Sequence, residues 1–111
     1  MEITLSLVGD IPIFHLLGRL DASSAPALEE RINLFLAEGG QKLVFDCQAL
    51  DYISSAGLRV FITTLRTMKT RGGLMAVASL QKPVREIFHL AGLEELFILG
   101  NSKEEAASLL G

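Results

Sequence analysis

The chain opens with a pattern of apolar and polar positions that is typical of a half-exposed strand. Ile3, Leu5 and Leu7 alternate with polar side chains, so we expect a strand over residues 2–8 with one apolar side. A second apolar run covers residues 11–17, and a glycine-containing turn separates the two runs. The pattern therefore predicts an antiparallel hairpin at the start of the fold.

Helical and strand patterns alternate through the rest of the chain. A serine or proline at a helix start, followed by apolar residues three and four positions apart, is typical of an amphipathic helix. Such helices are expected after Ser23 and Ser24, after Ser54 and Ser55, from Pro83 and after Ser102. Short apolar runs predict buried strands at residues 43–45, 74–78 and 96–99.

The predicted order is β-β-α-β-α-β-α-β-α, which indicates one α/β domain over residues 1–111. We expect four helices and a mixed, mostly parallel sheet of about five strands, because strands joined by helical crossovers run parallel. Loops that leave the carboxyl ends of parallel strands emerge at one edge of the sheet, where open α/β folds place their sites. Here those loops are residues 19–24, 46–55 and 79–82.

Composition and charge exclude several classes of protein. Half of the 111 residues are hydrophobic and 21% are charged, which predicts a folded chain with a substantial core. The net charge of −3 gives no overall field for a nucleic acid, and no apolar stretch is long enough for membrane insertion. The single cysteine, Cys47, cannot form an internal disulfide, which is in keeping with a reducing compartment. We therefore expect a cytoplasmic protein that binds neither nucleic acid nor membrane.

The sequence lacks the groups that familiar enzymes need. It has no glycine-rich phosphate loop, no nucleophile elbow and no Cys and His residues at metal-binding spacing. His15 falls within a predicted strand and His89 on the third helix, so a packed or solvated imidazole is the simpler interpretation, and Cys47 is interpreted as a small buried hydrophobe. We expect no catalysis, no cofactor and no metal. An enzyme or small-ligand receptor that uses Asp21 and Asp46 is a third interpretation.

The most informative segment joins a strand to a helix. Ser54 and Ser55 fall where the helix begins, so either hydroxyl can cap its first turn, and Gly57 lets another surface approach the backbone closely. The same position suits a phosphorylation site, because a phosphate at a helix N-terminus gains about 0.3 to 1 kcal/mol from the helix dipole. A docked partner would then meet about 1.5 to 2 new negative charges. A simple cap and a phosphorylation switch are both consistent with these residues.

The run YISSAGLR, residues 52–59, resembles the STAS domains of bacterial anti-sigma-factor antagonists, as do GRLD at residues 18–21 and the predicted element order. The resemblance covers essentially the whole chain. It implies a non-enzymatic regulator that, when unphosphorylated, binds an anti-sigma factor and so frees a sigma factor for transcription. It also implies that this partner is a serine kinase of the histidine-kinase-like ATPase type. In the family the kinase inactivates the antagonist by phosphorylating the serine two positions before the motif glycine, which is Ser55 here.

The expected partner-binding surface combines the motif with neighbouring charges. Asp21 matches an acidic position of the family's partner-facing surface. Six basic residues and no acidic one lie between Asp51 and Glu86, and Arg59 and Arg66 fall on the outer stripe of the second helix, which is either a solvated face or a docking surface. The predicted partner-binding residues are Asp21, Ser23, Ser24, Asp46, Ser54, Ser55, Ala56, Gly57, Arg59 and Arg66.

Two positions depart from the family's common pattern, and a second role stays open. Ser54 stands where an acidic residue is common and Ala56 where a hydroxyl residue is common, which leaves Ser54 as an alternative phosphate acceptor. We expect a free-standing domain that is a monomer or a weak dimer. The alternative is a constitutive adaptor subunit of a transporter or of a stress-signalling complex, in which Ser54 and Ser55 only cap the helix.

Overall fold

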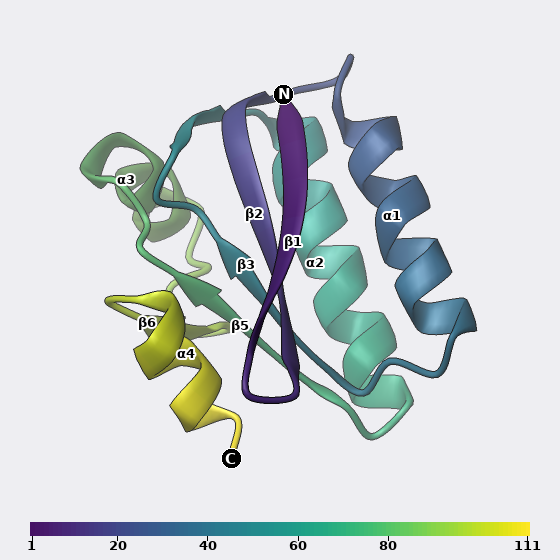
Figure 1. Cartoon of the computed structure of the whole chain (residues 1–111). Helices are drawn as coiled ribbons and strands as arrows, with labels where there is room; N and C mark the ends of the chain where they lie inside the picture. Colours follow the sequence, from purple (N-terminus) through teal and green to yellow (C-terminus); the bar gives the residue numbers. More distant parts are fainter.

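The computed structural model describes all 111 residues, and its strands form one mixed sheet with helices against both faces (Figure 1). The strands are β1 (Glu2–Val8), β2 (Ile11–Leu20), β3 (Lys42–Asp46), β4 (Leu50–Ile53), β5 (Leu74–Ala78) and β6 (Ile98–Gly100). The helices are α1 (Ala25–Ala37), α2 (Ser55–Thr70), α3 (Lys82–Leu90) and α4 (Lys103–Leu109).

The sheet has the strand order β1-β2-β3-β5-β6, and β4 pairs with the end of β2. β1 runs antiparallel to β2, whereas the other neighbours run parallel. This arrangement confirms the predicted hairpin and the predicted mixed, mostly parallel sheet. Helices cross between the parallel strands, so the ends of β2, β3 and β5 reach the same edge.

The structure contains a strand, β4, in a segment that the sequence pattern predicts as a loop. β4 lies within residues 46–55, and β2 continues three residues beyond its predicted end to pair with it. Gly18 has a φ of 100°, a conformation that favours glycine, at the point where the pairing register shifts. There are therefore six strands, and the order is β-β-α-β-β-α-β-α-β-α. A four-residue strand is too short to show a clear hydrophobic period.

Two hydrophobic cores lie on opposite faces of the sheet. The larger core packs α1, α2 and α3 against the sheet, and aromatic rings run through it from Phe14 to Phe45, Phe61 and Phe88. The smaller core packs Ala106, Ala107 and Leu110 of the C-terminal segment against the other face. Burial of each of these phenylalanine side chains contributes about 1.5 to 3 kcal/mol, so the larger core holds the elements around the carboxyl ends of the strands in place.

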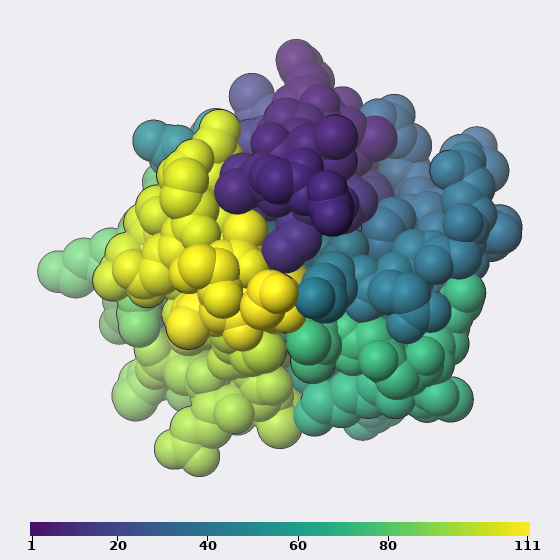
Figure 2. Space-filling model, turned by 60° about the horizontal axis from the view of Figure 1, so that its bottom comes forward, coloured from purple at the N-terminus to yellow at the C-terminus, as the bar shows by residue number.

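The edge strand β1 is more exposed than its alternating pattern suggests. Ile3 packs against the larger core, but Leu5 and Leu7 are 54% and 67% exposed. The helical layer ends at this edge of the sheet, so only one end of the apolar side is covered. Figure 2 shows purple β1 at the surface between the yellow C-terminal helix and the blue segment that ends α1.

Candidate partner-binding site

The site is built where β2 and β4 end and α2 begins. The backbone N–H of Ser54 donates to the carbonyl oxygen of Leu20 at 2.9 Å, which fastens the end of β4 to the end of β2. The guanidinium of Arg19 lies 4.2 Å from the centre of the Tyr52 ring, a cation–π contact between the same two strands. Two of the three loops expected to converge, residues 19–24 and 46–55, therefore meet at the first turn of α2.

The two serines at the start of α2 have different structural roles. Ser54 has extended backbone geometry, and its Oγ accepts a hydrogen bond from the N–H of Gly57 at 3.4 Å, so Ser54 is the cap. Ser55 is the first residue of the helix; its side chain is exposed and its hydroxyl makes no hydrogen bond within the chain. The sequence left open which serine caps the helix, and the geometry assigns that role to Ser54.

Gly57 is buried, and it determines how closely α2 approaches the sheet. A Cβ at this position would lie 2.7 Å from Cγ of Leu20 and 2.8 Å from Cγ1 of Ile53. The close approach expected at this glycine is therefore made by β2 and β4 of the same domain. Gly57 thus lies beneath the surface and packs against the sheet, whereas Ser55 is exposed and Ala56 is half-buried.

The loop before α1 is held by hydrogen bonds among its own polar residues. The Asp21 carboxylate accepts hydrogen bonds from the Ser23 hydroxyl at 2.8 Å and from the Ser23 N–H at 3.0 Å. The Ser24 hydroxyl accepts from the Asp21 N–H and donates to the Arg19 carbonyl, each at 2.9 Å. The bond from the Ser23 hydroxyl lowers the pKa of Asp21 below its ordinary value, and the backbone and Ser24 bonds act in the same direction. Asp21 is therefore an anionic group beside the start of α1.

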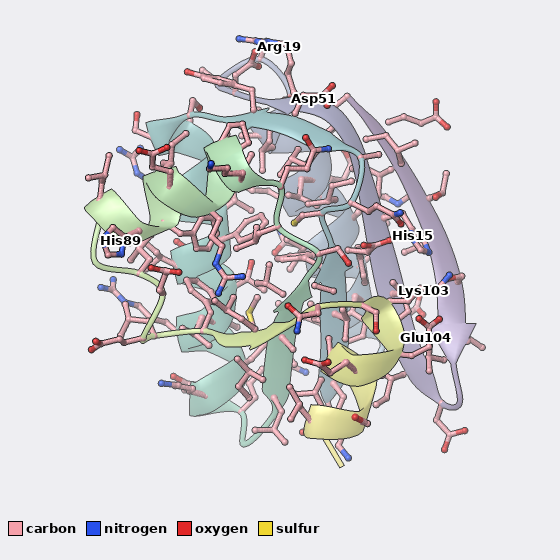
Figure 3. The ribbon with its side chains drawn as sticks, turned by 90° about the vertical axis from the view of Figure 1, so that its left-hand side faces the viewer. His15, Arg19, Asp51, His89, Lys103 and Glu104 are labelled. Atoms are coloured by element: carbon pink, nitrogen blue, oxygen red, sulfur yellow. The ribbon has the colours of Figure 1, made fainter.

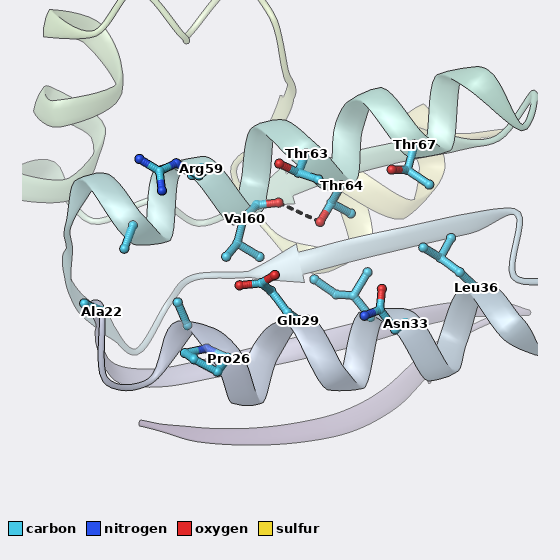
Figure 4. Close-up of a pocket in the computed structure, with 13 residues that line it drawn as sticks. Ala22, Pro26, Glu29, Asn33, Leu36, Arg59, Val60, Thr63, Thr64 and Thr67 are labelled. Atoms are coloured by element: carbon cyan, nitrogen blue, oxygen red, sulfur yellow. Dashed lines mark hydrogen bonds between the residues drawn. The ribbon is translucent and has the colours of Figure 1, made fainter.

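A groove runs between α1 and α2, and the loop before α1 contributes to its lining (Figure 4). It encloses about 230 Å³. Its walls include Ala22 from the loop before α1 and Ala56 from the first turn of α2. Glu29 of α1 and Arg59 of α2 are its only charged lining residues. The sequence pattern does not predict this groove, because the groove depends on the distance between two helices.

The outer stripe of α2 is exposed, as its spacing predicted. Arg59, Thr63, Arg66 and Thr70 are all exposed, and neither arginine takes part in an ion pair. Of the six basic residues between Asp51 and Glu86, Arg85 forms an ion pair: its Nε lies 3.1 Å from a carboxylate oxygen of Glu94. The face of α2 that continues from Ser55 therefore carries unpaired positive charge.

Asp46 is buried and directs its side chain away from this surface. Its carboxylate accepts a hydrogen bond from His15 Nδ1 at 2.7 Å and another from the N–H of Gln48 at 3.2 Å. The other ring nitrogen of His15 lies 2.6 Å from the Ser6 hydroxyl. These side chains come from β3, β2 and β1, on the face of the sheet that also carries Lys103 of α4 (Figure 3). Asp46 thus does not join the residues around Ser55.

The remaining titratable candidates have structural surroundings. His89 Nδ1 lies 2.7 Å from a carboxylate oxygen of Glu94, and this bond, with that from Arg85, lowers the pKa of Glu94. Cys47 is fully buried, as expected, and burial and the charge of Asp46 raise the pKa of its thiol far above the ordinary value. No three potential ligands of the His, Cys, Asp or Glu type cluster at metal-binding distance. None of the four helices combines the length and apolar character needed to cross a bilayer.

Comparison with known proteins places this chain in a family. The family model of the STAS domain matches residues 2–106. BtrV of Bordetella bronchiseptica, which is assigned as an anti-sigma factor antagonist, is 32% identical over 97% of this chain and 93% of its own length. The anti-sigma-B factor antagonist of Bacillus subtilis is 30% identical over 81% of this chain and 82% of its own. The chain therefore belongs to the STAS domain family, in its group of anti-sigma factor antagonists.

Solved structures agree with the fold. An assigned anti-sigma factor antagonist of Thermotoga maritima superposes with a TM-score of 0.91 at 21% identity, covering 97% of this chain and 93% of that one. SpoIIAA of Bacillus, in its phosphorylated form, superposes with a TM-score of 0.77 at 18% identity, covering 99% and 100%. These structures confirm the predicted α/β architecture of the STAS type.

Proposed function

We propose that this protein binds an anti-sigma factor through the surface around Ser55 and that phosphorylation of Ser55 ends this binding. The observation that carries the proposal is the free, exposed hydroxyl of Ser55 at the start of α2, beside the groove between α1 and α2. The relatives named as anti-sigma factor antagonists, and SpoIIAA with its phosphorylated form, support it. Such a protein acts by binding and has no catalytic step of its own.

The partner in this proposal is an anti-sigma factor that is also an ATP-dependent serine kinase. The Ser55 oxygen attacks the γ-phosphorus of ATP, the bond from that phosphorus to the bridging oxygen breaks, ADP leaves, and the hydroxyl proton passes to a base of the kinase. The helix start tolerates the phosphate, because the first N–H groups of a helix lack partners and the dipole favours an anion. The kinase surface that covered the neutral hydroxyl would have to desolvate about 1.5 to 2 negative charges.

Binding measurements on serine variants test this proposal. Ser55→Glu should weaken binding to the anti-sigma kinase of the same organism by at least about tenfold, because a fixed charge enters the contact. Ser55→Ala should bind like the unmodified protein and resist inactivation by kinase and ATP. Ser54→Ala is the matched control, and it should remain switchable because Ser54 only caps the helix.

Mass spectrometry identifies the acceptor directly. After incubation with kinase and ATP, fragment ions should place the phosphate on Ser55 rather than on Ser54, because only the Ser55 hydroxyl is free of a capping bond. Equal binding by the Ser55→Glu and Ser55→Ala variants would contradict the switch. Stable co-purification with a transporter, without a phosphopeptide, would favour the adaptor role instead.

A further inference from the structure

We infer that Arg59 pairs with the phosphate on Ser55 and that this pairing withdraws Arg59 from the groove between α1 and α2. The inference rests on the proposed function, since it concerns the modified form of the same serine. It assigns to phosphorylation a second effect beside the added charge, namely the loss of a cation from the binding surface.

The spacing on α2 brings the two side chains together. Ser55 and Arg59 are four residues apart on one helix, so their Cβ atoms are about 5 to 6 Å apart. Side chains on a helix lean toward its N-terminus, which directs the long Arg59 side chain back over the first turn. Figure 4 shows Arg59 at the end of the groove nearest the start of α2. Phosphate oxygens on Ser55 therefore lie within reach of the guanidinium.

The guanidinium of Arg59 is available for this contact. It takes part in no ion pair, and it donates no hydrogen bond within the chain. The other two arginines near this edge are unsuitable. Arg19 stacks on Tyr52, and Arg66 lies 11 residues after Ser55, which is about 16 Å along the helix axis. Arg59 is thus an unpaired cation one helical turn from Ser55.

The chemistry of the two groups favours contact between the phosphate and the guanidinium. A phosphoserine carries about 1.5 to 2 negative charges and three acceptor oxygens, and a guanidinium can donate two parallel hydrogen bonds to two of them. The N-terminal end of α2 adds a favourable dipole, and no acidic residue lies in the first turn to compete for Arg59.

The pairing changes the charge of the groove. Glu29 and Arg59 stand on opposite helices and are the only charged side chains that line it, so the unmodified groove is neutral overall. When Arg59 turns to the phosphate, Glu29 remains without an opposing cation. An acidic group of a partner that docks beside Arg59 would lose its counter-charge and meet a negative surface. Phosphorylation then acts on the groove as well as on the start of α2.

Phosphorus NMR on the whole protein tests the pairing without a kinase. Phosphoserine is incorporated at position 55 by genetic encoding, and its phosphorus resonance is titrated with pH. Because a nearby cation favours the dianion, Arg59→Gln should move the titration midpoint to higher pH by about half a unit. Arg66→Gln is the matched control and should leave the midpoint unchanged, and Arg59→Lys should recover part of the effect.

A second readout follows the arginine itself. The Nε–H resonance of Arg59 should shift when phosphoserine replaces Ser55, whereas that of Arg66 should not. Circular dichroism establishes that each variant is folded. If Arg59→Gln leaves the phosphorus midpoint where it was, the inference is wrong, whatever a kinase does to Ser55. If the pairing is present but no kinase modifies Ser55, the proposed function fails and the pairing stands.

Discussion

Two exposed serines in this chain lie close to an arginine or a histidine, but their hydroxyls are in opposite situations. Ser55, at the start of α2, is exposed and makes no hydrogen bond, with Arg59 one turn further along. Ser6, in β1, is also exposed, yet its hydroxyl is 2.6 Å from His15, which in turn contacts the buried Asp46. Exposure alone therefore does not distinguish a modification site from a structural contact.

The difference lies in what each hydroxyl would lose. A kinase that engages Ser6 must break its bond to His15, at about 0.5 to 1.5 kcal/mol, and must also reach into a paired strand. Ser55 sits where the chain has just left β4, and its neighbour Ser54 already satisfies the capping requirement. The comparison teaches that the Ser55 hydroxyl is free of hydrogen bonds because Ser54, the residue before it, caps α2.

The largest effect is expected at the structural site. Asp46→Ala removes the acceptor for His15 and for the N–H of Gln48, so it should lower the free energy of unfolding by about 2 to 3 kcal/mol. Chemical denaturation measures this change. Ser55→Ala is the control from the other site and should stay within about 0.5 kcal/mol of the unmodified protein. A similar loss in both variants would remove the distinction between the two sites.

A smaller difference in stability is expected between alanine variants of the two adjacent serines, Ser54 and Ser55. Ser54→Ala removes the cap of α2 and should cost about 1 kcal/mol, whereas Ser55→Ala removes no bond. Thermal unfolding of the two variants, compared with the unmodified protein, measures the difference. If Ser55→Ala were the more damaging change, Ser55 would be the cap and its availability to a kinase would be lost.

Much of this architecture follows from the sequence pattern. The hairpin, the four helices and the parallel crossovers were predicted because strong apolar periods and capping residues mark them. β4 was not, because Asp51 and Tyr52 interrupt a run of only four residues, and its pairing with β2 depends on Gly18 changing register. A short strand that pairs only with the end of another strand leaves little hydrophobic periodicity in the sequence by which to predict it.

The candidate site shows the same limit at the level of side chains. Ser55 and the outer stripe of α2 were recognisable from one segment and its helical spacing. The contact between His15 and Asp46 was not, because the two residues are 31 positions apart and meet only when β2 and β3 pair in a particular register. The groove likewise depends on how Gly57 sets the position of α2 against Leu20. Long-range register and packing distance are absent from local patterns.

The smallest effect expected is a pH dependence at the loop before α1. The folded pKa of Asp21 lies below its ordinary value of 3.8, so its carboxylate stabilises the fold above that value and loses this effect as the pH falls through the folded pKa. The melting temperature should therefore exceed that of Asp21→Asn at neutral pH, and the gap should close in strong acid. Ser23→Ala removes the main cause of the lowered pKa and should move the Asp21 titration, followed by NMR, toward 3.8. If Ser23→Ala left the Asp21 titration unchanged, the hydrogen bond from the Ser23 hydroxyl would not be the main cause of the lowered pKa.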